Sequence, residues 1–155
     1  MRCHTLIMIG ALLTSGAAVA QHSVDPMEVQ RRSHQRQVTL ERLAPERRSA
    51  QQQAELARLY YRSGRLEEAQ SAAQDALKAQ SDNAELLILL GDLQGRRQQW
   101  AQALASFNRA AQLRPRQADI ALRQGQALTA LGKSREADAA FASYRALQVA
   151  GRRSP

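Results

Sequence analysis

The 155-residue chain is poor in the residues that build disulfide frameworks, cysteine–zinc sites and β-sheets. Its single cysteine, Cys3, excludes an internal disulfide framework and a zinc site made of thiolates. Aromatic residues make up only 4% of the chain, which disfavours a β-sandwich or barrel because their strands rely on aromatic and β-branched side chains. Only four prolines and eight glycines stand among many Ala, Leu, Gln and Arg residues, so the composition predicts an all-α protein.

Basic residues outnumber acidic ones by 22 to 14, but the excess positive charge is spread thinly along the chain. No segment has the dense basic face that nucleic-acid binding needs. The few aromatic residues are also not interleaved with the charge, as base stacking would require. The sequence therefore predicts that nucleic acid is not a partner.

Residue types that carry catalysis or bind metals occur singly or at helix starts. The histidines are His4, His22 and His34, and none has a ligand partner at helical spacing. Glu67 and Glu68 begin a predicted helix, where negative charge interacts favourably with the helix dipole. The chain has no glycine-rich phosphate loop and no nucleophile elbow. We expect a protein that is not an enzyme and has no cofactor and no metal site.

Residues 1–20 have the pattern of a secretory signal peptide. Arg2 precedes a charge-free run that ends in Ala18-Val19-Ala20, the small-residue pattern cleaved by signal peptidase. The run is shorter than a typical membrane span and is interrupted by small polar residues. The sequence predicts cleavage after Ala20 and no transmembrane span in the mature chain. The signal resembles a bacterial one, so we expect the periplasm; an uncleaved anchor is the alternative.

Residues 50–151 divide without a gap into three blocks of 34 residues, 50–83, 84–117 and 118–151. Equivalent block positions hold similar residues: Ala69, Ala103 and Ala137 at position 20; Ala73, Phe107 and Phe141 at position 24; Ala57, Gly91 and Gly125 at position 8; Gly64, Gln98 and Gly132 at position 15.

Each block reads as two helices joined by a turn. In the first block, Leu56, Leu59 and Tyr60 form an apolar stripe at helical spacing, Gly64 interrupts it, and a second stripe begins at Leu66. One helix pair cannot bury its apolar face alone, so three stacked pairs are needed for a continuous core.

These blocks resemble the tetratricopeptide repeat family over about two-thirds of the chain. Three positions depart from the family pattern: Gln53 replaces an aromatic residue, Ser81 a terminal proline and Gln98 a turn glycine. The resemblance implies an all-α, right-handed solenoid of three helix pairs.

The segments that flank the three blocks are polar or basic. Within residues 21–49, Asp25-Pro26 resembles a helix start, and we expect a helix that caps the first pair. A partner-binding or oligomerising helix, or partial disorder, are the alternatives. Residues 152–155 form a basic tail. No further helix is expected to cover the third pair, so its last helix should expose an apolar face.

In the family's geometry, block positions 2, 5, 9, 12 and 13 face a concave groove. The predicted groove residues are Gln51, Ala54, Arg58, Tyr61 and Arg62; Glu85, Ile88, Asp92, Gly95 and Arg96; and Asp119, Leu122, Gln126, Thr129 and Ala130. Chaperone-binding relatives hold a terminal carboxylate with a Lys/Asn clamp. Ala54 and Arg58 stand at the two first-repeat clamp positions, so that activity is not predicted.

Together these features predict a non-enzymatic adaptor of the bacterial periplasm. Its groove would bind a protein or peptide partner during assembly or stabilisation of an envelope or secretion complex. The alternative is a structural subunit that self-associates through its uncovered C-terminal face.

Overall fold

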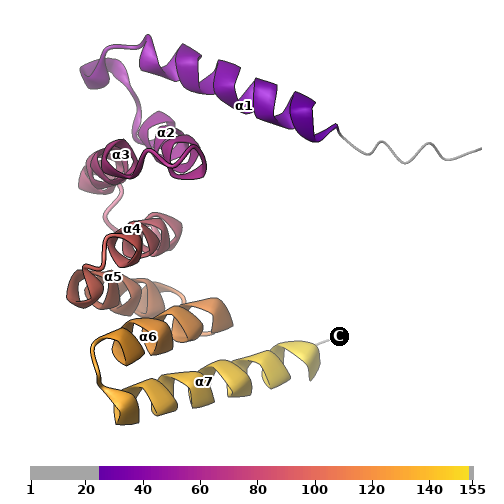
Figure 1. The fold of residues 1–155 in the computed structure, drawn as a ribbon, viewed down its shortest axis with the longest axis vertical. Helices are drawn as coiled ribbons and strands as arrows, with labels where there is room; N and C mark the ends of the chain where they lie inside the picture. The colour runs from indigo at the N-terminus through magenta and orange to yellow at the C-terminus, as the bar shows by residue number, and fades with distance from the viewer. Residues whose placement is uncertain (1–24, 154–155) are drawn as a thin grey trace, which may run out of the picture.

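The computed structural model describes residues 25–153, so the predicted signal peptide lies outside the described residues. This part of the chain forms helices and contains no strand. The helices are α1 (Pro26–Glu41), a short 3-10 helix η1 (Pro45–Arg47), α2 (Ala50–Arg62), α3 (Leu66–Ala79), α4 (Ala84–Arg96), α5 (Trp100–Leu113), α6 (Ala118–Ala130) and α7 (Ser134–Arg153). Helices α2 to α7 form three pairs stacked along the molecule, with α1 at one end and α7 at the other (Figure 1). The predicted all-α solenoid is confirmed.

Local sequence signals set the helix boundaries. Ser49 and Gln52 form a reciprocal capping box at the start of α2, and the side chain of Asn83 accepts a hydrogen bond from the Leu86 amide at the start of α4. The turns inside the pairs have left-handed residues at Gly64, with φ of 77°, and Gly132, with φ of 72°. Glycine adopts this conformation at little steric cost, so each pair folds back on itself there.

Small residues let the two helices of a pair approach closely. Ala69 and Ala103 are fully buried and Ala137 is 3% exposed. All three lie in the first turn of the second helix of a pair; we call these second helices, α3, α5 and α7, the outer helices. The buried ring of Phe107 packs against Gly91 of the same pair. Helix α6 adds the buried side chain of Ile120 to the same apolar cluster, so the core is continuous from one pair to the next.

Helix α1 is attached mainly through its C-terminal half. Leu40 is 1% exposed and belongs to the cluster that contains Leu56 and Tyr60, whereas Met27 at the other end is 73% exposed. The apolar residues of α1 are sparse, so little of its length can be buried. Within residues 21–49, the described part thus contains the helix α1, whose N-terminal half extends away from the stack (Figure 1).

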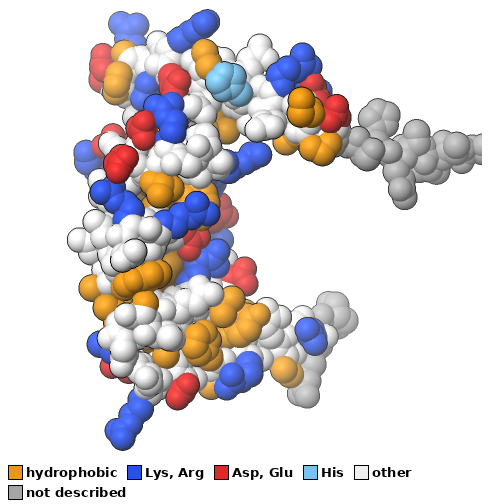
Figure 2. Space-filling model, in the orientation of Figure 1, with side chains coloured by type: hydrophobic (Ala, Val, Ile, Leu, Met, Phe, Trp, Pro, Cys, Tyr) orange, Lys and Arg blue, Asp and Glu red, His pale blue; other side chains and the backbone are white. Residues whose placement is uncertain are grey.

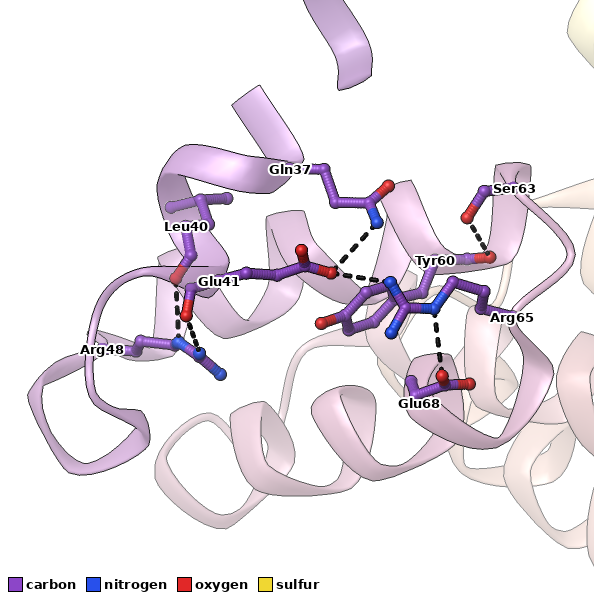
Figure 3. Close-up of polar contacts among 8 residues, drawn as sticks. All are labelled: Gln37, Leu40, Glu41, Arg48, Tyr60, Ser63, Arg65 and Glu68. Carbon is purple, nitrogen blue, oxygen red and sulfur yellow. Dashed lines mark hydrogen bonds and ion pairs between the residues drawn. The ribbon is translucent and has the colours of Figure 1, made fainter. Parts of the chain in front are cut away.

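A polar network completes the attachment of α1 (Figure 3). Arg48 donates to the backbone carbonyls of Leu40 and Glu41, at 3.1 Å each, and so satisfies the end of the helix. Glu41 accepts from the amide of Gln37 at 3.1 Å and from Arg65 at 2.7 Å. The guanidinium of Arg65 also lies 4.4 Å from the ring centroid of Tyr60.

The last helix, α7, has 20 residues and is longer than the 14-residue α3 and α5. It ends at Arg153, two residues past the predicted end of the third block. In this helix Tyr144 and Leu147 are half-buried and Val149 is 50% exposed. None of the helices in residues 25–153 is both long enough and apolar enough to cross a lipid bilayer.

Candidate functional site

The stack curves, and the first helices of the pairs, α2, α4 and α6, lie on its concave side (Figure 1). In the space-filling view the molecule is hollowed on this side, between α1 and α7 (Figure 2). Two clefts lie in this region. One, of about 360 Å³, lies between α1 and α2, and the larger one, of about 430 Å³, lies at the middle of the stack. We call the larger one the central pocket. It is lined by Tyr61, Gly91, Asp92, Gly95, Arg96, Trp100, Phe107, Leu122, Arg123 and Gln126.

Two glycines open the wall of the central pocket. Gly91 and Gly95 lie one turn apart on α4. A Cβ atom on Gly91 would overlap the Phe107 ring, and a Cβ atom on Gly95 would lie 3.1 Å from Cζ3 of Trp100. Because α4 carries no side chain at these positions, aromatic rings of the outer helix α5 reach the concave side and supply apolar surface there.

Two contacts hold the charged side chains of the central pocket. The guanidinium of Arg96 lies over the Tyr61 ring, 4.4 Å from its centroid. One turn earlier on α4, Asp92 Oδ1 accepts a hydrogen bond from Arg123 Nε at 2.8 Å, and these two side chains are about three-quarters buried. Within residues 25–153 no carboxylate forms an ion pair with Arg96. Arg96 is therefore the uncompensated charge of the pocket.

Beyond the pocket, Glu85 contacts two arginines. Arg58 Nη2 of the first pair donates to Glu85 Oε2 at 2.7 Å and so links the first pair to the second. Arg114, at the end of α5 in the same pair as Glu85, contacts the other carboxylate oxygen at 3.4 Å. The exposed pairs contribute little stability individually, but they neutralise Arg58 and Glu85 on the groove.

The structure brings six of the predicted groove residues together in the central pocket. They are Tyr61, Asp92, Gly95, Arg96, Leu122 and Gln126. Arg62 lies elsewhere, in a cleft of about 360 Å³ between α1 and α2 that Leu59 and His34 also line.

Other predicted groove residues lie near the ends of the inner helices or in the core. Gln51 and Asp119 are exposed in the first turns of α2 and α6. Ile88 is half-buried against the apolar cluster of the second pair. Ala54, at a clamp position, is buried, with 7% of its surface exposed.

Four residues of the central pocket were not predicted: Gly91, Trp100, Phe107 and Arg123. Counting positions on inner helices misses Trp100 and Phe107 because they belong to α5. The available signal was the glycine at block positions 8 and 12 of the second block, which leaves room for rings from the outer helix. Arg123 could have been found as an opposite charge one block away from Asp92.

The residues of the central pocket resemble those of a binding surface. Among residues 25–153, no three His, Cys, Asp or Glu side chains come together as a metal site would require. The central pocket instead combines an aromatic and aliphatic surface with one free guanidinium, a composition suited to recognising another chain.

Comparison with known proteins identifies the repeat. A profile of the tetratricopeptide repeat matches residues 54–115 and 88–155. The fold is similar to two solved structures of MamA. One, MamA MSR-1, has a TM-score of 0.69 and 21% identity over 75% of this chain and 67% of that chain. The other has a TM-score of 0.71 and 16% identity over 79% of this chain and 74% of that chain.

A third solved structure contains a bound peptide. The first tetratricopeptide domain of Spaghetti (RPAP3), bound to the HSP90 peptide SRMEEVD, has a TM-score of 0.61 and 24% identity. The match covers 64% of this chain and 79% of that chain. No curated protein matches the chain. At these identities the likeness to solved structures shows the fold.

Proposed function

The chain belongs to the tetratricopeptide repeat family, and we propose on that basis that it is a non-enzymatic adaptor whose concave face binds a protein or peptide partner. Proteins of this family are generally interaction scaffolds. The observation that carries the proposal is the central pocket, which collects lining residues from all three helix pairs. The Spaghetti domain, of the same fold, is bound to a short peptide, so the fold accommodates such a ligand.

The type of peptide that we propose differs from a chaperone terminus. Ala54 is buried and Arg58 is paired with Glu85, so neither is free to clamp a chain-terminal carboxylate. We propose instead an envelope or secretion component as the partner, because the pattern of residues 1–20 favours export to the periplasm. N-terminal sequencing of the native protein tests this location: a mature terminus at Gln21 supports it, and retention of Met1 in a cytosolic fraction contradicts it.

Site-specific photocrosslinking tests the adaptor proposal. A photoreactive residue at Gln126, exposed at the rim of the central pocket, should capture a defined partner in cells. The same residue at Gln74, exposed on the outer helix α3, should not. Leu122→Ala should reduce the capture at Gln126, whereas the matched change Leu113→Ala, outside the pocket, should leave it unchanged. Equal capture from both sites would contradict the proposal.

Apolar side chains that remain partly exposed on α7 favour a second candidate function, a subunit that self-associates through its C-terminal face. Tyr144, Leu147 and Val149 supply the apolar surface. Size-exclusion chromatography with light scattering separates the two functions. A monomer at all concentrations supports the adaptor, whereas an oligomer that Leu147→Ser and Val149→Ser dissociate supports the subunit.

A further inference from the structure

The central pocket places one uncompensated cation beside an apolar surface. Asp92 is occupied by Arg123 at 2.8 Å, so the negative charge of the pocket is neutralised from within. Arg96 has no such acidic partner in the described residues, and its guanidinium lies over the Tyr61 ring. The rings of Trp100 and Phe107 and the side chain of Leu122 line the same pocket.

Each part of this arrangement selects a different feature of a ligand. The guanidinium offers planar N–H donors that fit a carboxylate, and a cation resting on an aromatic face keeps that capacity toward its outer edge. The apolar lining gains free energy only when a large apolar side chain covers it. A ligand that supplies both groups a few ångströms apart therefore complements the pocket in charge and in hydrophobicity.

We infer that the central pocket selects an internal segment of a partner in which an acidic side chain stands next to a large apolar one. This inference rests on the proposed adaptor function and specifies its ligand. The carboxylate comes from Asp or Glu rather than from a chain end, because the clamp positions hold buried Ala54 and Arg58, which is already paired with Glu85. Arg96 binds the carboxylate, and Trp100 and Leu122 contact the apolar side chain.

Trp100 makes the test direct, because it is the single tryptophan of the chain and lines the pocket. The probe is the peptide acetyl-Gly-Ser-Glu-Leu-Phe-Glu-Gly-Ser-amide, which has no tryptophan. Two variants replace both Glu residues by Gln or by Lys, and a third replaces Leu and Phe by Ser. Titration of the full chain, followed by Trp100 fluorescence, gives the affinity of each.

The acidic apolar peptide should bind most tightly, and its affinity should fall as salt increases. Loss of the partly exposed charge pair should weaken the Gln peptide by about fivefold. The Lys and Ser peptides should bind more weakly still. Equal affinity of the Glu, Gln and Lys peptides would overturn the inference, as would tighter binding of a peptide that ends in Leu-Phe with a free carboxylate.

Two arginine variants test whether Arg96 is the residue that causes the preference for the Glu peptide. Arg96→Gln should bind the Glu and Gln peptides equally, because the cation that distinguishes them is gone. Arg62→Gln is the matched control: it has the same block position in the first pair, but it lies in the cleft between α1 and α2. It should keep the fivefold preference. A preference that survives in Arg96→Gln would overturn the inference.

The outcome also separates this inference from the proposed function. If no peptide of the panel binds at millimolar concentration while Gln126 still captures a partner, the ligand class is wrong and the adaptor function stands. If no peptide of the panel binds and Gln126 captures no partner, both the ligand class and the adaptor function are wrong.

Discussion

Gln98 has a backbone conformation that glycine adopts at the equivalent turns of the other two pairs. Its φ is 60°, against 77° at Gly64 and 72° at Gly132. A side chain disfavours this left-handed region because Cβ approaches the following carbonyl oxygen. The turn of the middle pair is therefore formed against a local preference, and the packing of α4 on α5 compensates for it.

Replacing Gln98 by Gly should raise the free energy of unfolding by about 0.5 kcal/mol, because relief of strain exceeds the added freedom of the unfolded chain. The matched change Gly64→Ala should lower it by about 1 kcal/mol. A Cβ atom on Gly64 would meet nothing within 4 Å, so this loss reflects backbone conformation alone. Urea unfolding measures both changes. A destabilised Gln98→Gly protein would contradict the strain argument.

At the residue scale, the sequence predicted several residues of the central pocket but not the contacts between them. Tyr61, Asp92 and Leu122 were placed on the groove by position counting, and they line the central pocket. The pairing of Asp92 with Arg123 was not predicted, because it joins residues 31 positions apart. Helical periodicity indicates which face a side chain takes, but it does not specify which residue of the next repeat lies opposite.

At the scale of elements, α1 differs from the other helices in what holds it. Its contact with α2 combines a small apolar anchor at Leu40 with ion pairs, including Arg36 with Glu55 at 2.8 Å. Hydrogen bonding from Gln37, assisted by Tyr60 and Arg65 and opposed by partial burial, holds the pKa of Glu41 below its ordinary value. Arg36 lowers the pKa of Glu55 in the same way.

These lowered pKa values predict that acid loosens α1 before the rest of the fold. A carboxylate whose pKa is lower in the folded state stabilises that state above its unfolded pKa, and the contribution is lost as the pH falls through the folded value. The attachment of α1 should thus be intact at neutral pH and weaken below a pH of about 4. Residue-resolved NMR shifts of residues 26–41, compared with those of α4, would follow the change.

The double variant Glu41→Gln, Glu55→Gln provides the control for this pH dependence. It should loosen α1 already at neutral pH and flatten the acid response, since neither side chain can then titrate. An unchanged acid transition in this variant would show that other groups attach α1.

Sequence patterns predicted the elements of the repeat region better than this helix. The stripe of Leu56, Leu59 and Tyr60 and the glycine that follows it correspond closely to α2 and its turn. In α1 the apolar spacing is irregular, so the sequence left capping, partner binding and disorder open. What fixes α1 is Leu40 together with Glu55 of α2 and Arg65 of the turn before α3, and a local pattern does not contain that information.

For the whole molecule, the linear order of the stack determines how many helix pairs a destabilising mutation affects. The middle pair contacts a neighbour on each side, whereas the last pair has the second pair as its neighbour within the described residues. In such an array, stability is a sum of terms for single pairs and for the interfaces between them.

Ala103→Leu and Ala137→Leu should therefore destabilise different numbers of helix pairs. Each change overpacks a close helix contact and should cost about 1 to 3 kcal/mol. Hydrogen exchange should become faster in all three pairs for Ala103→Leu, because both interfaces of the middle pair are disturbed. For Ala137→Leu the faster exchange should be confined to the last pair and its one neighbour. A neutral Ala103→Leu protein would show that the register assigned to the blocks is wrong.

The two glycines of α4 make side chains of the outer helix α5 part of the concave surface. Because Trp100 and Phe107 reach the concave side through the space that Gly91 and Gly95 leave, a mutation on α5 can alter ligand preference without changing any inner-helix residue. Position 100 is the more open to variation, since Trp100 is half-buried and Phe107 is 4% exposed. A combinatorial library intended to redirect binding would thus begin at position 100, on a helix that an inventory of groove-facing positions leaves out.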